Sequence, residues 1–337
     1  MPSSELDYTG KRVLVTGGAG FIGSNLCEAL LERGAQVVCM DNLLTGKREN
    51  IESYLGNQAF SFLEKSITDF DACLEATSGI DLVFHQAALG SVPRSIENPL
   101  RTNQHNITGF LNILEAAREN GCKRFVYAAS SSTYGDHEEL PKVEENIGKP
   151  LSPYAVTKYC NELYARVFYD LYGMETIGLR YFNVFGRNQD PDGAYAAVIP
   201  KFIQKMILGE RPTINGNGEQ SRDFTFVENV VEVNIQAGLS SNNEAFGEVF
   251  NIAFGQRTTL LELYQVLQEK IARYKPEVKK IEPIFGPVRH GDVKHSQASI
   301  EKARDILNYS PKFSPEEGLD RAITWYWESI SKNIELT

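Results

Sequence analysis

The 337-residue sequence predicts an α/β protein with a doubly wound parallel sheet and a smaller C-terminal α/β domain. Through the first half of the chain, short apolar strands alternate with helical segments, which is typical of βαβ units. Right-handed crossovers between such units wind helices onto both faces of one sheet. After residue 180 the alternation becomes irregular, and no Pro/Ser-rich linker intervenes. We therefore expect domains over residues 1–180 and 181–337, with segments that can interleave.

Apolar runs mark each predicted element, and turn residues mark its ends. Residues 12–16 read as a short buried strand, and Gly34 ends the following helix, as a glycine just past a helix often does. In the first half we expect strands at 12–16, 36–40, 60–64, 81–85, 124–129 and 176–180, and helices at 21–33, 99–120 and 152–172. In the second half we expect short strands near 213, 224, 249 and 281, and helices at 196–208, 227–239, 259–272 and 299–307.

Composition argues against several classes of protein. The formal charge is −10, which disfavours nucleic acid and anionic membranes as partners. The five cysteines are scattered without a CxxC spacing, which indicates free thiols in a reducing compartment rather than a zinc or redox site. No signal peptide or membrane-length apolar stretch is evident, so we expect a cytoplasmic protein.

A glycine-rich turn joins the first predicted strand to the first predicted helix. Gly17, Gly20 and Gly23 form a G-x-x-G-x-x-G pattern, which lets the backbone approach a pyrophosphate at the free amides of the helix N-terminus. Asp41 ends the second strand, where a carboxylate accepts hydrogen bonds from the adenosine ribose and repels a 2′-phosphate. The pattern therefore predicts a Rossmann-type site that prefers NAD to NADP.

A tyrosine and a lysine suggest acid–base chemistry. Tyr154 and Lys158 are four residues apart in a predicted helix and therefore share one face. An ammonium beside a phenol stabilises the phenolate, so we expect the pKa of Tyr154 to fall toward neutrality, as a general base for an alcohol requires. The run from Ser130 to Thr133 follows the fifth strand, at the carboxyl edge where ligands bind in this architecture. A hydroxyl there can share the proton of the substrate alcohol.

These motifs, in this order, resemble those of the extended short-chain dehydrogenase/reductases, and among them the UDP-galactose 4-epimerase family. The resemblance extends from about residue 11 to residue 327. It includes the stretches His85 to Ala88, Arg180 to Gly186, Ser221 to Phe224 and Arg289 to Asp292. The stretches Gln86 to Ser95 and Ala128 to Gly135 are similar to the branch acting on N-acetylated sugars, the UDP-N-acetylglucosamine 4-epimerases of polysaccharide biosynthesis.

The resemblance implies a mechanism in which NAD stays bound as the cofactor. Tyr154 would take the proton of the sugar 4-hydroxyl while hydride passes from C4 to NAD⁺, and Lys158 would hold the nicotinamide ribose. Ser130 would hydrogen-bond the 4-oxygen, with Ser132 close by. The 4-keto sugar would then turn its other face and take the hydride back, which inverts C4 without net redox change.

The resemblance also implies which residues bind each ligand. Contacts to NAD would come from Gly17, Gly20, Phe21, Ile22, Gly23, Asp41, Asn42, Ser66, Ile67, Gln86, Ala87, Ala88, Asn106, Tyr154, Lys158 and Tyr181. Arginine forks suit a diphosphate. Contacts to the UDP-sugar substrate would come from Gly90, Ser91, Ser130, Ser131, Tyr154, Asn183, Arg222, Arg289, Asp292 and Ser296.

Two positions bear on the substrate and the cofactor. Family members restricted to non-acetylated sugars carry a bulky Tyr where this chain has Ser296, and the small serine would leave room for a 2-acetamido group. The family usually has Asp-Ile after the third strand, where the Asp bonds the adenine amino group, whereas this chain has Ser66 and Ile67. A serine bonds adenine less strongly, which puts the affinity for the cofactor in doubt.

The family further suggests a homodimer, in which helices 99–120 and 152–172 pair across a two-fold axis into a four-helix bundle. Apolar stripes on these helices could instead face the sheet, and the sequence does not separate the two. The stripes contain Phe110, Leu111 and Leu114 on the first helix and Leu163, Val167 and Leu171 on the second.

Alternative activities differ in the residues they need. A 4,6-dehydratase or a UDP-glucuronate decarboxylase would need acidic residues in the Ser130 loop, which reads Ser-Ser-Ser-Thr-Tyr-Gly. A non-catalytic dinucleotide sensor would usually lack the Tyr or the Lys. UDP-glucose or UDP-galactose remain open as substrates, and so does UDP-N-acetylglucosaminuronate, because Arg94, Lys294 and His295 could neutralise its carboxylate.

Overall fold

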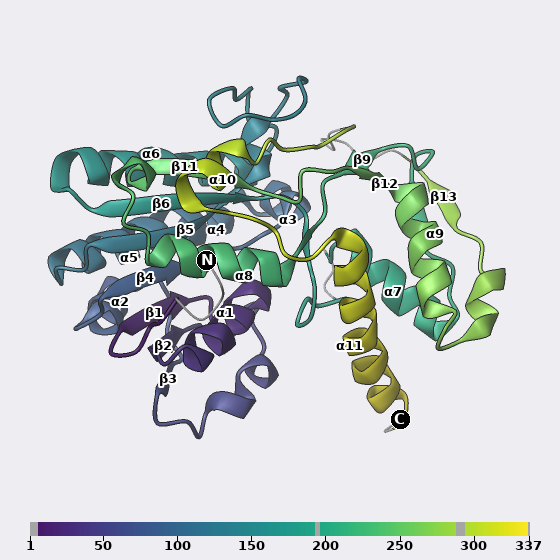
Figure 1. Cartoon of the computed structure of the whole chain (residues 1–337), viewed down its shortest axis with the longest axis horizontal. Helices are drawn as coiled ribbons and strands as arrows, with labels where there is room; N and C mark the ends of the chain where they lie inside the picture. The colour runs from purple at the N-terminus through teal and green to yellow at the C-terminus, as the bar shows by residue number, and fades with distance from the viewer. Residues whose placement is uncertain (1–5, 193–195, 288–293, 336–337) are drawn as a thin grey trace.

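The computed structural model describes residues 6–192, 196–287 and 294–335. At its centre is a seven-stranded parallel sheet with the strand order β11-β6-β5-β4-β1-β2-β3 (Figure 1). The predicted Rossmann-type doubly wound sheet is thereby confirmed. In chain order its strands are β1 (Arg12–Thr16), β2 (Gln36–Met40), β3 (Phe60–Leu63), β4 (Leu82–His85), β5 (Arg124–Ser130), β6 (Glu175–Tyr181) and β11 (Glu248–Ile252).

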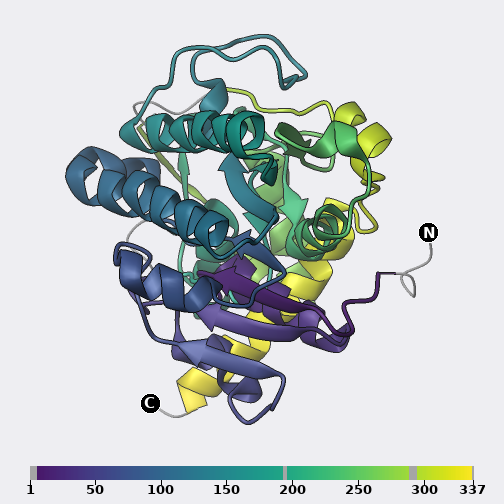
Figure 2. The same cartoon turned by 90° about the vertical axis from the view of Figure 1, so that its left-hand side faces the viewer.

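Helices cover both faces of this sheet, as a buried parallel sheet requires. Val13 and Val15 point into the core on the side of α1 and α8, whereas Leu14 points into the core beneath α2, α5 and α6. In Figure 2 the teal helices α5 and α6 lie on one side of the strands. The covering helices are α1 (Phe21–Glu32), α8 (Val227–Gly238), α2 (Phe70–Thr77), α5 (Gly109–Glu119) and α6 (Pro153–Tyr172).

The strand order reverses at β1, which has β2 on one side and β4 on the other. The connections that leave these strands therefore run in opposite directions and open a crevice at the carboxyl ends. This crevice positions the candidate site described below.

After β6 the chain builds a second group of elements beside the sheet, to the right in Figure 1. There α7 packs against both α9 and α11, and three two-stranded pairs form, β7 with β10, β8 with β13 and β9 with β12. The elements are β7 (Val184–Phe185), α7 (Val198–Leu208), β8 (Thr213–Asn215), β9 (Ser221–Arg222), β10 (Thr225–Phe226), β12 (Thr258–Thr259), α9 (Leu260–Ile271), β13 (Ile284–Gly286) and α11 (Pro315–Glu335). Helix α10 (Glu301–Leu307) instead packs against α8 and against β11 of the main sheet.

Several features differ from the expected elements, and α2 was not expected from the sequence. The helix expected over 99–120 is divided into α4 (Pro99–Asn103), a π-helical turn (Gln104–Thr108) and α5, and α3 (Val92–Glu97) precedes it. The strand expected near 249 is β11, which pairs with β6 at the edge of the main sheet instead of lying with the second group. The 21-residue helix α11 was not predicted, because its apolar residues are interspersed with charged ones.

Candidate active site

The glycine-rich turn between β1 and α1 is shaped by close backbone contacts. Gly17 has φ +68°, and a Cβ atom there would lie 2.7 Å from the backbone of Ala87. A Cβ atom at Gly23 would collide with the carbonyl oxygen of Gly17. Gly20 precedes α1 and offers no side chain to cap it, so the first amides of the helix remain available to an anion.

Asp41 lies at the carboxyl end of β2, directly across from this turn. Its carboxylate accepts hydrogen bonds from the amides of Ala19 at 3.1 Å and Leu43 at 2.8 Å. Burial raises the pKa of Asp41, although both amide hydrogen bonds oppose that shift. The carboxylate is therefore held at the place where an adenosine ribose would meet it, as the sequence predicts.

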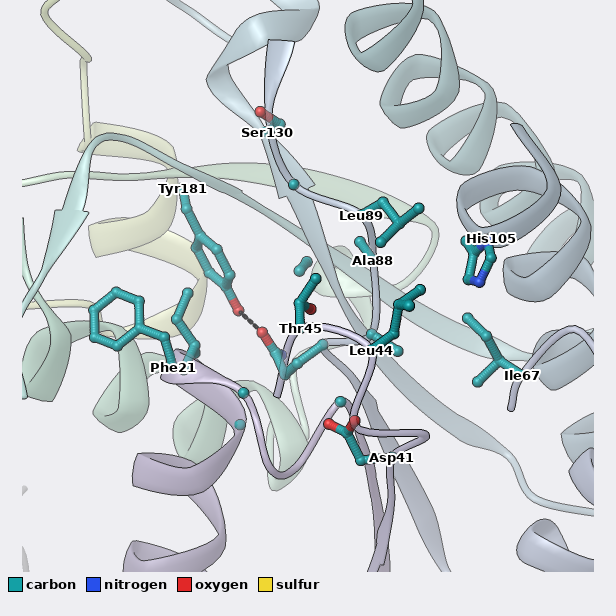
Figure 3. A pocket seen from close by; sticks show the side chains of 18 of the residues that line it. Phe21, Asp41, Leu44, Thr45, Ile67, Ala88, Leu89, His105, Ser130 and Tyr181 are labelled. Atoms are coloured by element: carbon teal, nitrogen blue, oxygen red, sulfur yellow. Dashed lines mark hydrogen bonds between the residues drawn. The ribbon is translucent and has the colours of Figure 1, made fainter. Parts of the chain in front are cut away.

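A cleft of about 400 Å³ runs from this turn to the ends of β4, β5 and β6. In Figure 3, Asp41 lies toward one end of the cleft and Ser130 toward the other, with Ala88 and Leu89 between them. Of the sequence-predicted residues, the cleft is lined by Gly17, Gly20, Phe21, Ile22, Gly23, Asp41, Asn42, Ile67, Gln86, Ala87, Ala88, Gly90, Ser130, Tyr154, Lys158, Tyr181 and Asn183. The fold thus gathers residues from seven separate segments into one elongated site.

The predicted catalytic residues meet at one end of the cleft. Ser130 is the last residue of β5, and its Oγ accepts hydrogen bonds from the amide of Ser132 at 3.2 Å and from the Oγ of Ser132 at 2.9 Å. Tyr154 and Lys158 belong to the first turns of α6, and Ser130 acts to lower the pKa of Tyr154. A phenol and a serine hydroxyl therefore both line the cleft wall.

The expected effect of Lys158 on Tyr154 is not what the structure shows. Loss of solvation raises the pKa of Tyr154, and its hydrogen bond to Ser130 offsets only part of this rise. The ammonium of Lys158 donates instead to the carbonyl of Ala128 at 2.7 Å. Burial lowers the pKa of Lys158 to about 8, against the attraction of the Glu162 carboxylate. The lysine charge is thus directed at a strand carbonyl and not at the phenol.

A buried ion pair lies one helical turn beyond Lys158. Glu162 receives hydrogen bonds from Nε and Nη2 of Arg180 at 2.9 and 2.8 Å. Arg180 also donates to the hydroxyl of Tyr134 at 3.0 Å, and Tyr134 donates to Asn251 at 2.6 Å. The network links α6 to β6, β11 and the turn after Ser130, so it fixes the elements that carry the catalytic side chains.

Several predicted residues support the cleft from behind its lining. The side chain of Asn106 accepts from the amide of Leu89 at 2.8 Å and donates to Thr157 at 3.1 Å. Ser66 accepts a hydrogen bond from Asn42 at 3.3 Å and shares one with Thr68 at 2.8 Å, which places it at the cleft rim.

The predicted substrate residues are more dispersed. Ser91 has φ 143° and caps α3, and Asn183 has φ 33° and donates to the carbonyl of Asp223 at 3.1 Å. Arg222 is buried and donates to the carbonyls of Ser221 and Lys294. Ser131 begins the turn that follows β5, and Ser296 is buried rather than on the surface. Arg289 and Asp292 lie outside the described residues.

Sequence reasoning missed some residues of the site. Leu44, Thr45, Lys65 and His105 line the cleft although no motif marked them. Most of them stand within two residues of a predicted position, which is the signal that could have found them.

Asn234 was also missed, and no local signal marks it. It is fully buried on α8, where it receives a hydrogen bond from the Gln86 side chain at 3.0 Å. It also pairs with the hydroxyl of Tyr181, which in turn donates to Gln86 (Figure 3). Asn234 therefore holds two cleft residues from an element that is distant in sequence.

The residues present fit a dinucleotide. The cradle at Gly17 and Gly23 has no room for a Cβ atom, the first residues of α1 line the cleft, and Asp41 lines it too. Within the described ranges no group of His, Cys, Asp and Glu could hold a metal ion. Within the same ranges no helix is long and apolar enough to cross a bilayer.

A sequence profile described as the NAD dependent epimerase/dehydratase family matches residues 13–253. The chain belongs to this family. Membership confirms the predicted NAD-dependent enzyme and its cofactor, and the matched region contains the glycine-rich turn together with Ser130, Tyr154 and Lys158.

Relatives in the family carry related names. A putative UDP-glucose 4-epimerase from Methanocaldococcus jannaschii is 37% identical over 93% of this chain and 97% of its own length. The UDP-N-acetylglucosamine 4-epimerase from Methanobrevibacter ruminantium, solved with UDP-N-acetylmuramic acid, is also 37% identical, with TM-score 0.87 over 95% of this chain and 99% of that one. The UDP-glucuronic acid 4-epimerase from Bacillus cereus, solved with UDP-glucuronic acid and NAD, is 31% identical, with TM-score 0.87 over 94% and 99%.

Proposed function

We propose that this epimerase/dehydratase family member is a UDP-sugar 4-epimerase that interconverts UDP-N-acetylglucosamine and UDP-N-acetylgalactosamine. The observation that carries the proposal is that Tyr154, Ser130 and Lys158 line the same cleft as the glycine-rich turn and Asp41. A base, a hydroxyl and a dinucleotide cradle in one cleft suit oxidation of a secondary alcohol and its reversal.

Each catalytic group has one task in this reaction. NAD, held by the glycine-rich turn and Asp41, would supply reversible hydride transfer at C4. Tyr154 removes the proton of the sugar 4-hydroxyl, and Ser130 hydrogen-bonds the 4-oxygen while that proton leaves. Ser132 orients Ser130, because its amide and hydroxyl both bond the Ser130 oxygen. Lys158, fixed on the carbonyl of Ala128, supplies a positive charge near the reacting centre.

The turn after β5 lacks the acidic side chain that a dehydratase would need to eliminate water. Residues 131–134 are Ser, Ser, Thr and Tyr, and none of them is a carboxylic acid. Epimerisation needs no such acid, because the proton taken by Tyr154 is returned to the same oxygen. This difference favours a 4-epimerase over a dehydratase.

Ser296 supports the choice of an N-acetylated sugar. The serine is 7% exposed, and its amide donates to the carbonyl of Ser221 at 3.0 Å, beside Arg222. Family members restricted to non-acetylated sugars carry a tyrosine here, which needs more room than the serine, and the relative from Methanobrevibacter ruminantium is named for UDP-N-acetylglucosamine. We propose that residues 1–180 form the domain that binds NAD and residues 181–337 the domain that binds the UDP-sugar. Strand β11 belongs to the second range but joins the sheet of the first.

A substrate panel tests the specificity. Purified protein is incubated in parallel with UDP-N-acetylglucosamine, UDP-glucose and UDP-N-acetylglucosaminuronate, and kcat/KM is measured for each. We expect the acetylated alcohol to have the highest value. Ser296→Tyr should lower kcat/KM for UDP-N-acetylglucosamine by about tenfold to 200-fold, because a pocket contact of this size is worth that much discrimination. A higher kcat/KM for the uronate in the wild type would overturn this choice of substrate.

We also propose a homodimer formed through α6. Leu163, Val167 and Leu171 are spaced one turn apart on this helix and are 52%, 47% and 69% exposed. The apolar stripe expected on the helix over 99–120 is not exposed in this way, because Phe110 and Leu114 are fully buried against the sheet. An apolar stripe of this length on a free helix face is typical of an interaction surface.

A further inference from the structure

Asp223 is a fully buried carboxylate outside the catalytic end of the cleft. Among the described residues, its oxygens accept hydrogen bonds from the backbone amides of Phe254 at 3.1 Å, Gly255 at 3.2 Å and Ala298 at 3.2 Å. The backbone amide of Gln256 also acts to lower the pKa of Asp223, against the effect of burial. These donors are uncharged and come from two segments that are distant in sequence.

The segments joined at Asp223 carry the candidate substrate residues. Arg222 precedes Asp223 directly, and the carbonyl of Asp223 accepts a hydrogen bond from Asn183 at 3.1 Å. Ser296 lies two residues before Ala298. The carboxylate of Asp223 therefore joins the segment of Arg222 to that of Ser296, and the backbone carbonyl of the same residue holds Asn183.

The segment around Ser296 is joined to its neighbours at several points in the described chain. His295 forms a bridge with Ser221, and the amide of Ser296 donates to the carbonyl of Ser221. Further along, Ala298 pairs with Lys142. At Ala298 the side chain of Asp223 also accepts a hydrogen bond from the backbone amide, which joins this segment to the residue that follows Arg222.

The converging amides favour a carboxylate at this point, although burial raises the pKa of Asp223 to about 7. Two carboxylate oxygens offer about four acceptor sites and no donor, which matches several converging amides. An asparagine has the same shape, but its NH₂ group would face backbone N–H donors and leave at least one amide without an acceptor. Buried amides without acceptors are unfavourable, so the segments would separate.

We propose that Asp223 is a positioning residue for the sugar-nucleotide site, because it holds the segments of Arg222, Asn183 and Ser296 in register. The proposal rests on the proposed function, since it assigns these residues to the binding of a UDP-sugar. Tyr154, Lys158 and Ser130 stand on α6 and β5, which Asp223 does not contact through any hydrogen bond in the described chain. Loss of the carboxylate should therefore weaken binding and spare the chemical step.

The test compares Asp223→Asn with the wild type as NAD-containing proteins. Binding of UDP alone is measured by titration calorimetry, and kcat and KM are measured with UDP-N-acetylglucosamine. We expect the Kd for UDP and the KM to rise at least about tenfold, as small displacements of positioning groups can cause. We expect kcat at saturation to stay within about threefold, the pattern that lost uniform binding produces.

Asp81→Asn is the matched control. Asp81 also accepts a backbone hydrogen bond, from Arg12 at 2.7 Å, but it lies just before β4, at the amino-terminal edge of the sheet, away from the cleft. This variant should bind UDP as the wild type does. An unchanged Kd and KM in Asp223→Asn, or a fall in kcat alone, would overturn the proposal.

If Asp223→Asn does not fold, Asp223→Glu replaces it, because it keeps the charge and displaces the carboxylate by one methylene. A tenfold weaker binding of UDP in the folded Asp223→Glu protein would support the proposal, and wild-type binding would contradict it. UDP binding separates this test from the proposed function. Wild-type protein that binds UDP but epimerises no sugar nucleotide contradicts the proposed function alone.

Discussion

Tyr154 has to give up its proton in the proposed reaction, yet loss of solvation raises the pKa of its phenol. The adjacent charge of Lys158 is held on the carbonyl of Ala128. Sequence spacing places both side chains on one face of α6, but it cannot show where the ammonium points. The direction of a long, flexible side chain depends on acceptors from other strands, and this is why the expected pKa of Tyr154 was wrong for the structure described.

Replacing Tyr154 by Phe removes the general base and keeps the ring. We expect kcat to fall about 10²- to 10⁴-fold, the usual contribution of a positioned acid or base. The NAD content of the purified variant, measured after denaturation, should equal that of the wild type, because the cradle at Gly17 is untouched. Retention of more than a tenth of wild-type activity would contradict the assignment.

Lys158 should impose an alkaline limit on the reaction. Burial lowers its pKa to about 8, so its charge is present below that pH and is lost as the pH rises through it. We expect kcat to fall above about pH 8, as measured from the pH profile of the wild type. Glu162→Gln removes the charge that favours the ammonium, so its alkaline limb should move to lower pH. A rate that stays constant up to the ordinary lysine pKa of about 10.4 would contradict this role.

Among the elements, the strands of the sheet and most helices could be predicted closely from apolar runs and their turn residues. The π-helical turn at 104–108 could not, since it follows from the buried hydrogen bonds of Asn106 to Leu89 and Thr157. The place of β11 also escaped prediction, because a short apolar strand does not encode which edge it joins. Long-range partners decide both features, and local sequence does not report them.

The turn between β1 and α1 has no room for a side chain at Gly23. Gly23→Ala brings a Cβ atom against the carbonyl of Gly17, so the turn must open and the approach to a pyrophosphate is lost. We expect the variant to be purified without NAD, as judged by its absorbance and by release of nucleotide on denaturation.

Gly56→Ala is the control for this turn. A Cβ atom at Gly56 meets nothing within 4 Å, and this protein should retain NAD. Full NAD content in Gly23→Ala would show that the cradle tolerates a side chain and that the account of the turn is wrong.

At the scale of the whole molecule, α6 presents an exposed apolar stripe formed by Leu163, Val167 and Leu171. Leu163→Glu places a charge in the exposed stripe of α6, which should prevent two copies from associating. We expect the wild type to have the mass of a dimer and the variant that of a monomer by light scattering. Leu208→Glu, on the exposed face of α7, is the control and should leave the mass unchanged. A monomeric wild type would contradict the proposed dimer.

The central claim is that the molecule oxidises and reduces one sugar carbon while its NAD remains bound. Proton NMR of purified protein with UDP-N-acetylglucosamine in D₂O, without added NAD, tests it most directly. The expected result is growth of the anomeric signal of UDP-N-acetylgalactosamine with hydrogen retained at C4, because the same hydride returns. Deuterium at C4, or no new anomeric signal while NAD is present in the protein, would contradict the account.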